Sequence, residues 1–491
     1  MHLLSGLVLV IYGICLAFIF GYSLVQLHLT ILYWLCKRSA QRIKAYPAPD
    51  VWPAVTVQLP VYNERYVVER LLDAIAAFDY PRHLLQVQIL DDSTDDTTEL
   101  IQTRLKTYEG SGIDFQHIRR ERRSGFKAGA LQYGLARATG DFIAIFDADF
   151  VPGPDFLKRT IPAFTSTKIG VVQTHWGHLN QNYSLLTRLQ AFGLDAHFTV
   201  EQSGRNSAGH FINFNGTAGV WRKTCITDAG GWQADTLTED LDLSYRAQLK
   251  NWQFVYLEQV ETPSELPVAM GALKSQQFRW AKGAAETARK HLRQVWKSDK
   301  PAGTKAHAVF HLLNSGIFIC VLVTALLSVP LLYIKAELPD LQFLFKIGAV
   351  LLISLLSLSF FYWTALYQKT HDASKTTWQF IPLFLLFLSM SMGLSLHNSL
   401  AVLEGYIGKK SPFIRTPKYN IVQAADSWRK QAYFLKSINL LTILEGILAV
   451  YFLFGIVAAF ELHDFGLLPF HVLLMLGFGS VFLYSVLHSR R

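Results

Sequence analysis

The chain has 491 residues, enough for more than one structural unit. Hydrophobic residues make up 51% and charged residues 17%, which is too apolar for a wholly soluble protein of this length. The net charge is +9, but the basic residues flank apolar runs without a nucleic-acid-binding motif, so nucleic acid is not an expected partner. The four cysteines form no CxxC pair and imply neither a disulfide framework nor a zinc site.

An apolar run from Leu3 to about Leu35 opens the chain and predicts a transmembrane helix, assigned to residues 1–36. The run is longer than the core of a signal peptide and lacks a basic leader. It is followed by the basic residues Lys37, Arg38, Arg42 and Lys44. Because basic flanks stay in the cytosol, we expect the N-terminus outside and the next domain inside.

A domain of mixed composition is expected over residues 45–265. One strand begins at Val55 and ends in a turn by Glu64. Further strands are expected at 85–90, 113–118, 142–146, 170–174 and 254–257, and helices at 66–78, 97–108, 128–138, 156–164, 185–201 and up to about 250. This alternation predicts βαβ units and a parallel, Rossmann-like sheet, whose ligands bind at the carboxyl ends of the strands.

The remainder is expected to return to the membrane. Residues 266–300 predict a basic amphipathic interface helix, and 306–491 a transmembrane region with spans at about 308–334, 342–366, 440–460 and 467–488. The loop 409–439 carries seven basic residues against one acid and should be cytoplasmic. We therefore interpret the apolar segment 380–408 as interfacial or re-entrant rather than spanning.

Two carboxylates, Asp147 and Asp149, end the apolar run that begins at Phe142. Oxygen ligands at this place suit a hard divalent cation that carries a phosphate group. A second Asp-x-Asp occurs at Asp240 and Asp242, so the pattern alone is weak.

Five further features follow strands or helices in a fixed order. They are Pro60-Val-Tyr62-Asn-Glu64, Asp91-Asp92, Lys127, Thr238-Glu239-Asp240 and Gln276-Gln-Phe-Arg279-Trp280. Each alone is explained by a turn, a helix cap, a solvated lysine or a helix surface. Their joint occurrence on one α/β domain is much harder to explain by chance.

In this order the residues resemble a processive family 2 glycosyltransferase with the GT-A fold, of the cellulose synthase and cellulose-synthase-like mannan or glucan synthase type. The resemblance covers the soluble domain and rests on Asp91-Asp92, the DxD at 147–149, the TED at 238–240 and the QxxRW at 276–280. It implies an α/β GT-A cytosolic domain, embedded in an α-helical transmembrane protein, that binds a nucleotide-sugar donor.

The resemblance also implies a role for each group. Asp147 and Asp149 would hold Mg²⁺ or Mn²⁺. The nucleotide-sugar donor would contact Pro60, Tyr62, Glu64, Asp91 or Asp92, Lys127, Asp147, Gln276 and Arg279. Asp240, next to Glu239, would be the general base. One base without a carboxylate nucleophile implies a single displacement with inversion.

The acceptor would meet Trp280 through its aromatic face, and Gly216 and Thr217 resemble an acceptor-end loop. Phe413, Thr416 and Lys418 resemble the gating loop of cellulose synthases, although Pro417 and Tyr419 depart from that pattern. The alternative for this stretch is a solvated basic loop held at anionic lipid headgroups.

We expect a hexosyltransferase that adds glucose or mannose from UDP-glucose or GDP-mannose to a β-linked polysaccharide and passes the product across a plasma or inner membrane. The alternative is a synthase that adds one sugar to diacylglycerol or ceramide. A transporter or receptor that only binds nucleotide is disfavoured, because it would need no base such as Asp240. Since a lone protomer has few spans for a channel, an oligomer or an accessory export partner is considered.

Overall fold

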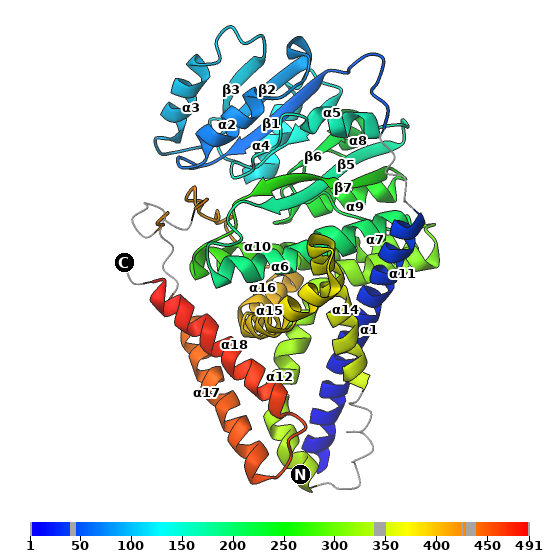
Figure 1. Ribbon diagram of the computed structural model, residues 1–491, viewed down its shortest axis with the longest axis vertical. Coiled ribbons are helices and arrows are strands. Elements are labelled where there is room, and N and C mark those ends of the chain that lie inside the picture. Colours follow the sequence, from blue (N-terminus) through cyan, green and yellow to red (C-terminus); the bar gives the residue numbers. More distant parts are fainter. Residues whose placement is uncertain (1, 40–45, 338–349, 424–425, 429–437, 490–491) are drawn as a thin grey trace.

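The computed structural model describes residues 2–39, 46–337, 350–423, 426–428 and 438–489. It consists of an α/β domain above a set of long helices, with the interface helix α10 (Met270–Lys297) between them (Figure 1). Basic residues counted above at positions 42, 44, 429, 430 and 436, and the start of the expected 342–366 span, lie outside the described residues.

The domain is built on a seven-stranded sheet in the order β3-β2-β1-β4-β6-β5-β7. The strands are β1 (Val55–Val61), β2 (Leu85–Asp91), β3 (Asp114–Arg119), β4 (Phe142–Ile145), β5 (Ile169–His178), β6 (Gly219–Arg222) and β7 (Gln253–Ser264). β1 to β4 pair in parallel, as expected, whereas β6 runs antiparallel to both β4 and β5. No strand was expected at β6, which has only four residues.

The helices of the domain cover both faces of this sheet (Figure 1). They are α2 (Val68–Ala76), α3 (Thr97–Lys106), α4 (Phe126–Leu135), α5 (Phe156–Thr160), α6 (Leu185–Ala196), α7 (Gln202–Ser207), α8 (Lys223–Asp228) and α9 (Glu239–Leu249), with short 3₁₀ turns at Arg82–Leu84 and Ile161–Ala163. On β1, Val57 and Leu59 pack in a core with Leu71 and Ile75 of α2. The sheet and the helix therefore pack through apolar residues at alternate strand positions and on one helical face, as the spacing of these residues predicts.

The expected helix over 185–201 is interrupted. α6 ends at Ala196 and continues as a π-helical turn, His197–Glu201, before α7. Similarly, the expected span 308–334 is divided into α11 (Ala302–Leu312) and α12 (Ile317–Glu337) by a short turn at Asn314–Gly316. Hydrophobic periodicity does not register the first break, because the apolar positions Phe198 and Val200 continue through it.

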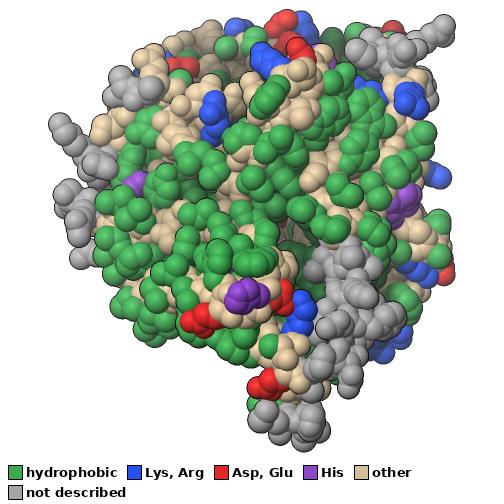
Figure 2. Space-filling model, turned by 60° about the horizontal axis from the view of Figure 1, so that its bottom comes forward, with side chains coloured by type: hydrophobic (Ala, Val, Ile, Leu, Met, Phe, Trp, Pro, Cys, Tyr) green, Lys and Arg blue, Asp and Glu red, His purple; other side chains and the backbone are tan. Residues whose placement is uncertain are grey.

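The remaining helices are α1 (His2–Ser39), α14 (Val350–Thr370), α15 (Ala373–Gly393), α16 (Ser395–Ile407), α17 (Leu440–Glu461) and α18 (Leu468–Leu487). Among the described residues, five helices are long and apolar enough to cross a membrane: those within 4–38, 314–337, 373–393, 440–461 and 468–487. The face that these helices form is dominated by hydrophobic side chains (Figure 2). The chain is thus a helical membrane protein.

The segment expected to be interfacial, 380–408, forms most of α15 and all of α16. By length and composition α15 could span a membrane. In Figure 1, however, α15 and α16 lie directly below α10 and are seen nearly end-on, whereas α1, α12, α17 and α18 run lengthwise away from the domain. The interfacial interpretation stays a prediction, and the orientation of α15 is compatible with it.

Candidate active site

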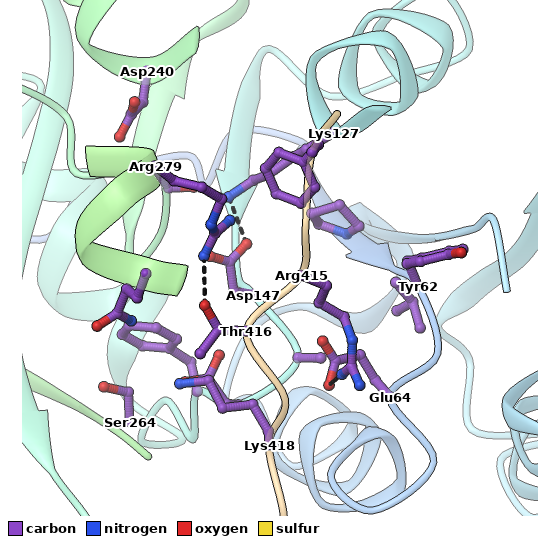
Figure 3. A pocket seen from close by; sticks show the side chains of 18 of the residues that line it. Tyr62, Glu64, Lys127, Asp147, Asp240, Ser264, Arg279, Arg415, Thr416 and Lys418 are labelled. Atoms are coloured by element: carbon purple, nitrogen blue, oxygen red, sulfur yellow. Dashed lines mark hydrogen bonds and ion pairs between the residues drawn. The ribbon is translucent and has the colours of Figure 1, made fainter. Parts of the chain in front are cut away.

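A cavity of about 190 Å³ opens at the carboxyl ends of β1, β2 and β4. Among the residues singled out above, it is lined by Pro60, Tyr62, Glu64, Asp92, Lys127, Asp147, Asp149, Gly216, Glu239, Asp240, Gln276, Arg279, Trp280, Phe413, Thr416 and Lys418. Segments that are far apart in sequence therefore meet at one place, as Figure 3 shows for the labelled residues.

The two aspartates of the first DxD each hold a lysine. Lys127 donates from Nζ to Asp147 Oδ1 across 2.5 Å, and Lys418 donates to Asp149 Oδ2 across 2.6 Å. The backbone N–H of Asp147 donates to the hydroxyl of Thr217 across 2.9 Å. Both carboxylates therefore face positive charge in the cavity, and the hydrogen bond to Thr217 holds the main chain at Asp147.

Lys127 reaches the cavity from the first turn of α4. Its Nζ also donates to the carbonyl of Gly216 across 2.9 Å and lies 3.9 Å from Glu239 Oε1. Gly216 has φ of +80°, and a Cβ at this residue would lie 3.1 Å from Asp240 Oδ2. Glycine is required there because the backbone is left-handed and passes close to the carboxylate.

Asp240 lies in the first turn of α9, where the helix N-terminus favours a negative charge. Burial, together with the adjacent Glu239 carboxylate, raises the pKa of Asp240 to about 7, while Lys127 opposes both effects. A carboxyl group with a pKa near neutral pH is suited to accept a proton from a hydroxyl.

The second Asp-x-Asp does not form a second pair of this kind. Asp242 is fully buried and points away from the cavity. Its Oδ2 accepts from Arg246 at 2.8 Å, and its Oδ1 accepts from His291 at 2.7 Å and from Lys290 at 2.8 Å. Asp242 therefore ties α9 to α10 and has no oxygen left for a ligand.

Arg279 extends from α10 across the cavity. Its Nη2 donates to Thr416 Oγ1 across 2.8 Å, and its guanidinium carbon lies 4.6 Å from the ring centroid of Phe413. Its buried Nε has no hydrogen-bond partner among the described residues. A buried guanidinium with an unused donor is matched by an anionic ligand such as a phosphate.

The position of α10 is fixed on its other side by the membrane helices. Lys274 donates to Glu445 of α17 across 2.6 Å and to Ser485 of α18 across 2.9 Å. Lys282 donates to Glu404 of α16 across 3.0 Å. Arg279 and Trp280 lie between these two anchors, so the helix bundle positions their side chains.

Of the two aspartates at the carboxyl end of β2, only Asp92 lines the cavity. Asp92 pairs with Arg120. Asp91 is buried and accepts from Ser93 N at 2.8 Å, Thr98 Oγ1 at 2.7 Å and His117 Nε2 at 2.9 Å. Asp91 therefore stabilises the turn that follows β2 and does not face the cavity.

Thr217 is also buried and does not line the cavity, unlike its neighbour Gly216. The acceptor-end stretch thus presents a glycine to the cavity and uses the threonine hydroxyl to hold the DxD backbone.

The loop that contains Phe413, Thr416 and Lys418 crosses the mouth of the cavity (Figure 3). Phe413 stacks on Phe126 of α4 with centroids 5.7 Å apart. Beyond Lys418, the backbone N–H of Tyr419 donates to Glu265 across 2.9 Å. The loop is therefore bound to α4, to α10 and to the end of β7 at once.

Several cavity residues were not singled out from the sequence. Arg415 forms a 2.5 Å ion pair with Glu64, and the guanidinium of Arg123 lies 3.3 Å from the ring centroid of Tyr62. Burial raises the pKa of Glu64 to about 7, although Arg415 opposes the shift. Arg415 belongs to the basic loop 409–439 noted above, but side-chain direction in a loop is not encoded in periodicity.

The donor set fits a divalent cation with phosphate ligands. Among the described residues no cluster of three or more His, Cys, Asp or Glu side chains could hold a metal by itself. Asp147 and Asp149 do offer carboxylate oxygens, which are hard ligands. Each carboxylate now pairs with the ammonium group of a lysine, which occupies the place where a cation would be attracted.

Comparisons with known proteins agree with this geometry. Residues 53–283 match the family described as "Glycosyltransferase like family 2". The chain is 39% identical to glucomannan 4-beta-mannosyltransferase 1 of Oryza sativa subsp. japonica over 319 residues, which cover 60% of this chain and 61% of the rice protein. It is 40% identical to glucomannan 4-beta-mannosyltransferase 2 of Arabidopsis thaliana over 291 residues, 57% of this chain and 54% of the relative.

A solved mannosyltransferase from Pyrobaculum calidifontis, in complex with GDP-Man and Mn²⁺, superimposes with a TM-score of 0.55 and 19% identity, covering 82% of this chain and all of that one. At this identity the likeness concerns the fold. The class defined by sheet and cavity is thus a GT-A domain in a helical membrane protein. Residues 53–283 therefore form a family 2 glycosyltransferase domain, and the chain is similar to enzymes of the cellulose-synthase-like type. It spans about 54–61% of the length of the two plant relatives.

Proposed function

We propose that the protein transfers mannose from GDP-mannose to the end of a β-1,4-linked, mannan-type polysaccharide. The observation that carries the proposal is the single cavity that gathers the DxD pair, Asp240, Arg279 and Trp280. The choice of mannose is supported by the names of the relatives, which are glucomannan 4-beta-mannosyltransferases. UDP-glucose is the alternative donor, and a lipid the alternative acceptor.

In this proposal the acceptor hydroxyl attacks the anomeric carbon of the donor as the bond from that carbon to the diphosphate breaks. Asp240 accepts the hydroxyl proton, and the configuration at the anomeric carbon inverts. Glu239 keeps the pKa of Asp240 raised, which adjusts its basicity to neutral pH. Gly216 leaves room for the attacking hydroxyl beside Asp240 Oδ2.

The leaving diphosphate meets positive charge on the protein. Arg279 would donate two parallel hydrogen bonds, and Lys127 and Lys418 would move from the aspartates to phosphate oxygens. A divalent cation, Mg²⁺ or Mn²⁺, held by Asp147 and Asp149 would neutralise the diphosphate when bound. Tyr62, Glu64, Asp92 and Pro60 surround the part of the cavity that would take the nucleoside.

Trp280 would offer its ring face to the acceptor sugar. The loop with Phe413, Thr416 and Lys418 would close over the bound donor, and its contacts to Arg279 and Asp149 support this role. The basic end of α1, at Lys37 and Arg38, supports a cytosolic catalytic domain with the N-terminus outside. Passage of the product across the membrane is the further part of the proposal, supported by the anchoring of α10 to α17 and α18.

The proposal is tested with purified protein in membranes, Mn²⁺ and labelled GDP-mannose or UDP-glucose. A β-mannanase-sensitive polymer supports it. Label recovered only in the lipid extract contradicts it. In sealed, inside-out vesicles, product protected from added mannanase supports translocation, and product digested without detergent contradicts it.

A further inference from the structure

A second cavity, of about 590 Å³, lies away from the candidate active site, between α6, α14 and α15. Its walls come from α6 and the residues just before it, the last turns of α14 and the first two thirds of α15. The lining combines polar side chains, among them Arg188, Lys369 and Gln379, with apolar ones, among them Phe192, Trp378 and Leu386. We refer to it as the α6–α15 groove.

The lining of the groove has an excess of positive charge. Asp195 is the only acid among the residues that line the groove, and its two carboxylate oxygens already accept from His178 at 3.1 Å and from Lys369 at 2.6 Å. The guanidinium of Arg188 is exposed and has no ion pair within the described part of the chain. An anionic group is therefore the complementary ligand.

The apolar side chains of the groove continue onto an exposed apolar face of α15. Trp378 is 79% exposed, and on the same helix Ile381, Leu385 and Leu386 are 51%, 45% and 42% exposed. The groove lies where α14 ends and α15 begins, which is the end of the long helices nearest the α/β domain (Figure 1). Exposed tryptophan beside basic residues is typical of the boundary between headgroups and acyl chains.

The groove is also joined to the active site through α6. Phe192 and Asp195 line the groove, whereas Leu194, on another face of the same helix, lines the catalytic cavity. Leu189 of α6 packs with Met270 at the start of α10, the helix that carries Arg279. An occupant of the groove would therefore support the helix that forms one wall of the catalytic cavity.

We propose that the α6–α15 groove binds one anionic glycerophospholipid, with its phosphate at Arg188 and Lys369 and its acyl chains along Trp378 and the exposed face of α15. The inference does not depend on the donor or the product of the proposed reaction. It concerns a lipid that stays bound, not one that receives a sugar.

The test uses the full chain in nanodiscs of phosphatidylcholine with a minor fraction of phosphatidylglycerol. Native mass spectrometry measures the lipid retained after release from the discs. Wild type is expected to retain phosphatidylglycerol above its bulk fraction, and Arg188→Gln to lose this enrichment. The matched control, Arg293→Gln on an exposed position of α10, should keep it.

A second measurement locates the lipid. Brominated phosphatidylglycerol should quench tryptophan emission more than brominated phosphatidylcholine at the same mole fraction, and Trp378→Phe should remove the difference. Excess inorganic phosphate should leave the retained lipid in place. The proposal is overturned if Arg188→Gln retains as much phosphatidylglycerol as wild type, if Trp378→Phe keeps the extra quenching, or if phosphate alone displaces the lipid.

Discussion

Lys418 donates from its ammonium group to Asp149 Oδ2 across 2.6 Å, although the two residues are 269 positions apart. The same nitrogen also donates to the carbonyl of Glu265. A residue of the loop thus neutralises the second carboxylate of the DxD when no donor is present, and it competes with the cation that the proposed reaction requires.

Replacing Lys418 by Gln should separate cation binding from transfer. Without the ammonium group, Asp149 is free, so binding of Mn²⁺ without donor should tighten by about tenfold, the effect of one charge-assisted hydrogen bond of ~1.5 kcal/mol. Transfer should slow, because Lys418 no longer reaches the diphosphate. Calorimetry with Mn²⁺ and initial rates measure the two effects.

The matched control is Lys410→Gln, in the same loop but outside the catalytic cavity. It should change neither quantity. Equal Mn²⁺ affinity in Lys418→Gln and wild type would show that the contact with Asp149 does not compete with the cation.

Arg279→Lys should weaken use of the donor. A lysine keeps the charge but loses the planar fork and the bond to Thr416. The loss of one or two charge-assisted hydrogen bonds, ~1.5–3 kcal/mol, lowers kcat/KM by roughly 10- to 150-fold. Rates at varied donor concentration measure it, with Arg289→Lys on the same helix as control. A kcat/KM within twofold of wild type would exclude a role at the diphosphate.

The pH dependence should follow Asp240. Its pKa is raised by burial to about 7, and only the ionised form accepts a proton. The kcat/KM should therefore fall as the pH decreases below about 7, with a slope of one, and level off above it. Asp240→Asn should lower kcat by roughly 10²- to 10⁴-fold and remove this limb from the residual activity.

Glu64 provides the control for the profile, because the pKa of its carboxyl group is also raised to about 7. Glu64→Gln should retain the acid limb that Asp240→Asn loses. If the acid limb of the profile disappeared in Glu64→Gln and persisted in Asp240→Asn, the titrating group would be Glu64, which would contradict the role of Asp240.

Asp242→Asn should act on stability. Asp242 is buried between Arg246, Lys290 and His291, and the neutral amide removes their shared negative charge and replaces one acceptor oxygen by an NH₂ donor. Breaking such a buried ion cluster costs about 3–5 kcal/mol. Thermal unfolding of the variant measures the loss, and nucleotide affinity of the folded fraction should stay unchanged. An unaltered melting temperature would contradict the structural role of Asp242.

The sequence was most informative where a pattern has a direct structural cause. The parallel strands β1, β2 and β4 are largely apolar runs that end in polar turns, and acids at their carboxyl ends must lie at one edge of the sheet. It could therefore be predicted that an acid at the end of β2 lies near Asp147, but not which of Asp91 and Asp92 it is. The family resemblance supplied Asp240 and Arg279, which no local period relates to that edge.

The sequence could not predict which side chains enter the cavity, because this depends on the direction in which each side chain points. Asp91 and Asp92 are adjacent on a chain that ends a strand, so they point to opposite sides, but only the structure assigns Asp92 to the cavity. Arg415 lies in a loop without period, and its contact with Glu64 depends on how the loop crosses the cavity. β6 is too short and the π-helical turn too continuous with α6 to appear in the hydrophobic pattern.

The central claim is tested most directly by the donor and the product. Purified protein in membranes is incubated with Mn²⁺ and labelled GDP-mannose or UDP-glucose, beside Asp240→Asn. We expect a polymer from GDP-mannose that β-mannanase digests, and almost none from the variant. A wild-type product found only in the lipid extract, or a polymer that Asp240→Asn makes equally fast, would contradict it.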